Sequence, residues 1–69
     1  MENNQGNKLG KKIKKLRNDL GLSQDELARQ ADVSYTTLTK IETGIVKKPS
    51  VYVVAKIAKA LNISIKKLT

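Results

Sequence analysis

Apolar residues recur at helical spacing near both ends of the chain. Steps of four, three and four residues near the N-terminus join Leu9, Ile13, Leu16 and Leu20. Near the C-terminus the corresponding stripe is Val51, Val54, Ala58 and Leu61, with Ala55 and Ile57 beside it. Each stripe predicts one buried face of an amphipathic helix. No alternating pattern of strand type occurs in the sequence, so we expect an all-α fold.

Serine residues mark the beginnings of the remaining helices. Ser23 and Glu26 have the spacing of a capping box, in which each side chain accepts a hydrogen bond from the other residue's backbone. Ser34 is expected to cap a helix over about 35–43, ended by Gly44, and Ser50 is expected to cap the C-terminal helix. Ser64 predicts a fifth, very short helix carrying Ile65 and Leu68, after a left-handed Asn62. The sequence therefore predicts a bundle of four to five short helices.

The segment 24–41 has the pattern of two short helices joined by a tight turn. Its small or apolar positions are Leu27, Ala28, Ala31, Val33, Leu38 and Ile41. The turn requires a left-handed backbone at Asp32, which aspartate tolerates. With the apolar positions inside, the side chains of Tyr35, Thr36, Thr39 and Lys40 point away from the core. A row of hydrogen-bonding side chains on an exposed helix is suited to reading bases in the major groove.

Charge favours a polyanionic partner. The chain of 69 residues has 14 Lys and Arg against 6 Asp and Glu, a formal net charge of +8. The basic residues gather before Asn18 and after Glu42, where no acidic residue interrupts them. Such a field attracts nucleic acid first and an anionic membrane second, although a solubilising surface gives the same total. The longest apolar run, 51–55, is far shorter than the roughly 20 residues of a spanning helix.

Composition argues against catalysis and metal binding. The chain has no Cys and no His, and its six carboxylates are scattered. We see no nucleophile–base pair, carboxylate dyad or metal cluster, and the glycines form no phosphate loop. We therefore expect no enzymatic activity, no metal site and no cofactor. Residues 1–7 are polar and are expected to form a flexible arm before a single domain over 8–69.

The chain resembles the lambda-repressor-like, Cro/C1-type (XRE) helix-turn-helix domains. The matching stretches are Leu22-Ser23-Gln24, Glu26-Leu27-Ala28, Val33-Ser34, Leu38, Ile41-Glu42, Gly44, Pro49-Ser50, Lys56-Ile57-Ala58-Lys59-Ala60-Leu61 and Ile63-Ser64. The resemblance extends from about Leu9 to Leu68 and includes helices on both sides of the motif. It implies a compact bundle that contains a helix-turn-helix.

The resemblance also implies roles for individual residues. Base reading would fall to Ser34, Tyr35, Thr36, Thr39 and Lys40, and phosphate contacts to Gln24, Thr43, Lys47 and Lys48. Arg17 and Glu42 would form a structural ion pair. The function implied is that of a bacterial or phage transcriptional regulator, with repression favoured, which binds a palindromic operator as a dimer. The expected location is the cytoplasm, in association with the nucleoid.

Several interpretations stay open at this point. The protein could serve mainly to bind a protein partner, as an antitoxin or accessory domain, or act as a cationic peptide at membranes. Ile45 and Val46 either pack inward or meet a partner, and Tyr52 and Val53 either complete the core or form a dimer seam. The lysines at positions 11, 12, 14 and 15 form either a general electrostatic coat or specific phosphate contacts.

Overall fold

The computed structural model describes residues 8–68, and these form four α-helices and one 3₁₀ helix. The helices are α1 (Lys8–Asp19), α2 (Gln24–Ala31), α3 (Tyr35–Thr43), α4 (Val51–Ala60) and η2 (Ile65–Lys67). No strand occurs within this part of the chain. The all-α bundle predicted from the sequence is confirmed. The predicted arm over 1–7 lies outside the described residues, as does Thr69.

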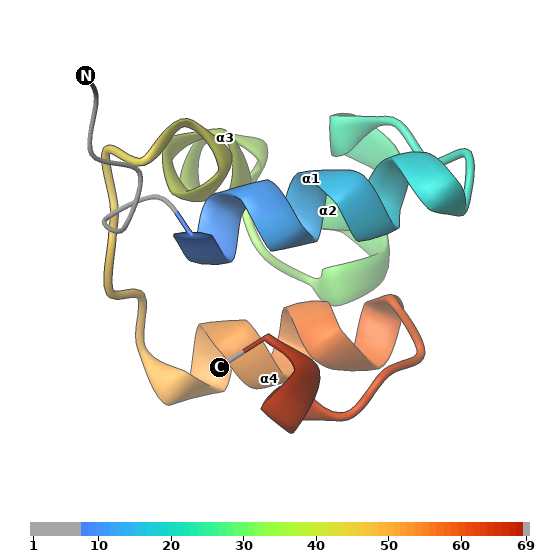
Figure 1. Cartoon of the computed structure of the whole chain (residues 1–69). Helices are drawn as coiled ribbons and strands as arrows, with labels where there is room; N and C mark the ends of the chain where they lie inside the picture. Colours follow the sequence, from blue (N-terminus) through green and yellow to red (C-terminus); the bar gives the residue numbers. More distant parts are fainter. Residues whose placement is uncertain (1–7, 69) are drawn as a thin grey trace, which may run out of the picture.

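The helices enclose one core. α1 packs on α3, α2 packs on both α3 and α4, and η2 folds back against α4. Figure 1 shows α1 crossing in front of α2, with α4 and η2 together on the opposite side of the molecule. The largest fully buried side chains are Ile13, Leu27, Leu38, Ile41 and Ile57. Because they come from all four α-helices, burying them fixes α3 relative to the rest of the bundle.

Local signals in the sequence set where the helices begin and turn. Ser23 Oγ accepts a hydrogen bond from Glu26 N at 3.0 Å, and Glu26 Oε1 accepts one from Ser23 N at 2.8 Å. This is the predicted capping box, and the caps at Ser34 and Ser50 also form. Asp32 and Asn62 both have left-handed backbones, with φ of 58° and 62°. The tight turn between α2 and α3 therefore forms as its sequence predicted.

Two predictions of buried stripe residues are wrong. Leu20 lies just beyond the end of α1 and is 53% exposed, and Val51 at the first position of α4 is 63% exposed. Both lie at the end of a helix, outside the core. Helical periodicity alone therefore predicted a buried stripe that was too long in each case. In α4 the fully buried Ile57 belongs to the main stripe, together with Val54, Ala58 and Leu61.

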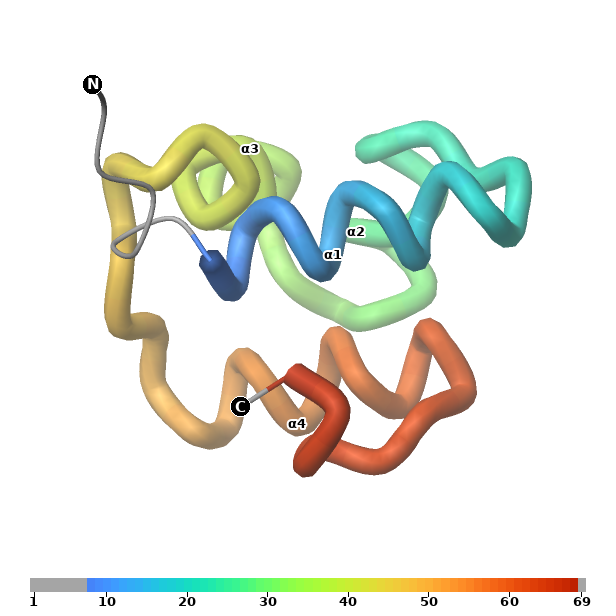
Figure 2. Tube along the Cα trace, viewed as in Figure 1, coloured from blue at the N-terminus to red at the C-terminus, as the bar shows by residue number. Residues whose placement is uncertain are grey.

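Two neighbouring apolar pairs each divide between core and surface. Val46 packs against the core, and its N–H donates to Lys40 O at 3.0 Å, whereas Ile45 is exposed. Val53 likewise packs against the core, whereas Tyr52 is exposed. The tube in Figure 2 follows the segment between α3 and α4 down one side of the molecule. Ile45 is therefore exposed on this segment, and Val51 and Tyr52 are exposed in the first turn of α4.

Within residues 8–68, none of the helices has the length and apolar character needed to cross a membrane.

Candidate nucleic-acid interface

A buried ion pair ties α1 to the end of α3. Arg17 and Glu42 are only 8% and 6% exposed. Arg17 Nε donates to Glu42 Oε2 at 2.8 Å and Arg17 Nη2 donates to Glu42 Oε1 at 3.1 Å. The third guanidinium nitrogen, Nη1, donates to Leu22 O at 2.8 Å. This two-pronged geometry compensates both charges and also holds the chain between α1 and α2.

Gln24 joins the same network. Its Nε2 donates to Glu42 Oε1 at 3.0 Å, so the Glu42 carboxylate accepts three hydrogen bonds from α1 and α2. The carboxamide has two N–H groups, and this bond uses one of them. The second can donate to a phosphate oxygen. The contact with Glu42 was missed from the sequence, because nothing in the local pattern links residues 18 positions apart.

The opposite face of α3 presents polar side chains to solvent. Ser34, Tyr35, Thr36 and Lys40 are exposed, and Thr39 is half-buried. Leu38, Ile41 and Glu42 occupy the buried face of the same helix. The structure thus places all five residues assigned to base reading on or beside the solvent-facing side of one short helix. This helix is anchored to the bundle by its other face.

Basic side chains flank this face. Thr43 ends α3, and Lys47 and Lys48 follow it in the segment leading to α4; all three are exposed. The ammonium groups of Lys40, Lys47 and Lys48 give the side of the molecule around α3 a positive charge. The exposed lysines of α1 are spread along that helix. One of them, Lys15, forms an ion pair with Asp19 on the same helix, at 3.3 Å. The charge nearest to α3 is therefore suited to a polyanion.

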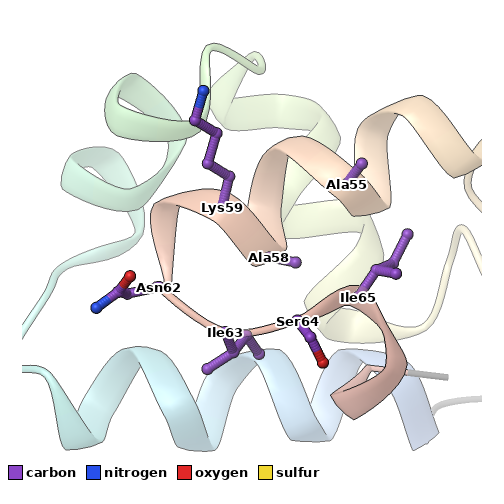
Figure 3. Close-up of a pocket in the computed structure, with 7 residues that line it drawn as sticks. All are labelled: Ala55, Ala58, Lys59, Asn62, Ile63, Ser64 and Ile65. Carbon is purple, nitrogen blue, oxygen red and sulfur yellow. The ribbon is translucent and has the colours of Figure 1, made fainter.

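A separate hollow opens between α4 and η2 (Figure 3). It is lined by Ala55, Ala58, Lys59, Asn62, Ile63, Ser64 and Ile65. None of these residues belongs to α3, and Lys59 supplies the charged group. The hollow is open to solvent, and both apolar and polar side chains line it.

Comparison with known proteins identifies the arrangement. The family model HTH_3, described as helix-turn-helix, matches residues 13–68. The crystal structure of the restriction-modification controller protein C.AhdI from Aeromonas hydrophila superposes with a TM-score of 0.87 at 30% sequence identity, over 93% of this chain and 96% of that one. A comparison with curated proteins gave no match.

Two solved structures of SinR are also similar. SinR, described as the master regulator for biofilm formation and solved in complex with DNA, has a TM-score of 0.84 at 33% identity, covering 87% of this chain and 95% of that one. A SinR protein/SinI protein complex gives the same TM-score and identity, with 87% of this chain and 58% of that chain covered. At these identities the similarity extends beyond the fold to the sequence.

Proposed function

The chain belongs to the HTH_3 helix-turn-helix family, and we propose that it is a transcriptional regulator that binds double-stranded DNA sequence-specifically. The observation that carries this proposal is α3, which turns Tyr35, Thr36 and Lys40 to solvent while its other face is anchored in the core. An α-helix with this arrangement fits the major groove of B-DNA. Support also comes from the similar SinR protein, which was solved in complex with DNA.

The roles that we propose for the individual side chains are compatible with their positions on and beside α3. Base edges are approached by Ser34, Tyr35, Thr36, Thr39 and Lys40. The phosphate backbone passes beside Thr43 and is neutralised by Lys47 and Lys48, while the free N–H of the Gln24 carboxamide donates to a phosphate oxygen. The Arg17–Glu42 pair holds α3 in position and touches no DNA. The protein works in the cytoplasm, on the nucleoid.

We extend this proposal to a homodimer on a palindromic operator. Two copies related by a two-fold axis present their α3 helices to successive major grooves about 34 Å apart. The exposed Ile45, Val51 and Tyr52 offer the apolar surface for the contact between copies. A dimer that covers an operator in this way excludes other proteins from it, which makes repression the favoured outcome.

Selection from random duplex DNA, followed by titration of the enriched sequence, tests the proposal. We expect a palindrome bound at least about 10³-fold more tightly than random DNA at near-physiological salt. The affinity should fall with salt at a log–log slope of about −0.9 for each neutralised phosphate. Failure to enrich any sequence, or a complex insensitive to salt, would contradict it.

A protein partner is the second candidate function. Ile45, Val51 and Tyr52 are exposed apolar side chains outside α3, and SinR was solved in complex with a second protein, SinI. The variant Tyr52→Ser separates the two uses of this surface, with Tyr35→Ser as the matched control on α3. Weaker binding to the palindrome but unchanged binding to a half-site favours the homodimer. A variant that binds both duplexes as the wild type does favours a heterologous partner.

A further inference from the structure

The hydroxyl groups around α3 differ in which of them still have a proton to donate. Ser34 Oγ lies 2.8 Å from Thr37 Oγ1 and donates to it, and Thr39 Oγ1 donates to Thr36 O at 2.9 Å. Thr43 Oγ1 donates to Thr39 O at 2.8 Å. A hydroxyl has a single proton. While these bonds persist, Ser34, Thr39 and Thr43 have no donor to offer a base.

Lys40 is the charged donor on the solvent-facing side of α3, beside the exposed hydroxyl groups of Tyr35 and Thr36. Its ammonium group has three N–H bonds and the side chain is exposed. The sequence of α3, YTTLTKIET, has no Arg, Asn or Gln. It therefore lacks the planar side chains that read adenine through N6 and N7 or clamp guanine with two parallel bonds. The groove atoms that suit a lysine are the acceptors O6 and N7 of guanine.

The threonines supply methyl groups. Thr36 and Thr39 are three residues apart and thus neighbours on the helix surface. Because the Thr39 hydroxyl is turned to the Thr36 carbonyl, its methyl group is the part of the side chain left to contact DNA. Lys40 lies four residues after Thr36, on the same side of α3. A small apolar surface therefore adjoins one ammonium group, and its counterpart in the major groove is the C5-methyl group of thymine.

We propose that each operator half-site is read as a guanine opposite Lys40 next to a thymine whose methyl group packs on Thr36 and Thr39. This assignment rests on the proposed function and adds the chemistry of the bases. A single ammonium group and a methyl contact discriminate between bases less strongly than a bidentate pair of hydrogen bonds does. Specificity per position is therefore modest, and shared between the two base types.

Base analogues placed in the selected palindrome test the assignment. Uracil in place of thymine removes only the C5-methyl group, and 7-deazaguanine removes only the N7 acceptor. We expect one thymine position in each half-site at which uracil lowers the affinity about fourfold. We expect one adjacent guanine at which 7-deazaguanine lowers it roughly fivefold.

Matched variants connect each base to its side chain. Thr36→Ser with Thr39→Ser removes both methyl groups and keeps both hydroxyls, and should abolish the difference between thymine and uracil. Lys40→Ala should abolish the difference between guanine and 7-deazaguanine while leaving the uracil effect in place. Melting temperatures compared with the wild type establish that these variants fold.

The outcomes separate this assignment from the proposed function. A palindrome that is bound specifically but is indifferent to both analogues at every position overturns the base assignment and leaves DNA binding intact. Analogue effects that persist in the matched variants overturn it as well. If no sequence is enriched at all, the proposed function fails and the base assignment fails with it.

Discussion

Glu42 and Lys40 lie two residues apart on α3, yet their surroundings are opposite. Glu42 is buried and accepts three hydrogen bonds from Arg17 and Gln24. Lys40 is exposed to solvent. Since each residue turns a helix by about 100°, positions two apart point to opposite sides. A polar side chain on one face thus holds α3 in place, whereas one on the other face is available to a ligand.

The two faces of α3 explain how so short a helix could present side chains to DNA. α3 has nine residues and could not stay helical alone in water. The buried pair, with Leu38 and Ile41, fixes its position on the bundle, so the exposed face needs no residues for stability. We therefore expect substitutions on the two faces to separate into effects on folding and effects on binding.

Glu42→Ala should give the largest effect. It leaves the Arg17 guanidinium buried without its carboxylate, at a cost of about 3–5 kcal/mol in the free energy of unfolding. Because a core of this size supplies only a few kcal/mol, much of the variant should already be unfolded in the absence of urea. A urea titration at 25 °C measures this loss of stability. The paired change of Arg17→Met with Glu42→Leu should restore most of the stability. A loss below about 1 kcal/mol in the single variant would contradict a role for the pair in the fold.

Lys40→Ala should show the reverse behaviour. Specific DNA binding should weaken by about 1–3 kcal/mol, while the free energy of unfolding should change by less than about 0.5 kcal/mol. Titration of the selected palindrome and of random duplex measures the first, and urea unfolding the second. The matched control is Lys59→Ala on α4, which should leave the specific affinity nearly unchanged. Equal weakening on both duplexes would make Lys40 a phosphate contact.

Ser23→Ala should destabilise the protein moderately, because Ser23 is polar and exposed but caps α2. Loss of the capping bond to Glu26 N should cost about 1 kcal/mol of stability. Ser23→Gly, which also lacks the hydroxyl, should cost only a few tenths of a kcal/mol. Thermal unfolding of the two variants checks this order. If the Ser23→Ala variant were as stable as the wild type, exposure alone would distinguish polar residues that stabilise the fold from those that are available to a ligand.

The smallest effect concerns acidity at the same cap. The backbone N–H of Ser23, followed by its hydroxyl, holds the pKa of Glu26 below its ordinary value of 4.5, against an opposing effect of burial. Because the folded-state pKa is lowered, the stabilisation is present above pH 4.5 and is lost as the pH falls through the folded-state value. Urea unfolding between pH 7 and pH 3 should show a shallower loss in Glu26→Gln. An identical pH profile in both proteins would exclude Glu26 as a source of the pH-dependent stability.

Local features were predictable from the sequence, and long-range ones were not. Capping by Ser23 and the left-handed backbones at Asp32 and Asn62 depend on a few adjacent residues, and the structure has them as predicted. The burial of Leu20 and Val51 was predicted wrongly because burial depends on where one helix leaves its neighbours.

The candidate site also combines features that the sequence predicted with features that it did not. That α3 turns polar residues outward follows from its apolar period, since Leu38 and Ile41 fix the inward side. The hydrogen bond from Gln24 to Glu42, and the internal bonds of the Thr39 and Thr43 hydroxyls, depend on side-chain geometry that spacing does not specify. Contact of this face with DNA stays a prediction.

Amide chemical-shift mapping would show whether DNA meets the solvent-facing side of α3. ¹⁵N-labelled protein would be titrated with the selected palindrome, and the shift changes followed residue by residue. We expect the largest changes from Ser34 to Thr43 and at Lys47 and Lys48, with small changes in η2. Changes confined to the start of α4 and to the hollow between α4 and η2, with α3 unaffected, would contradict this expectation.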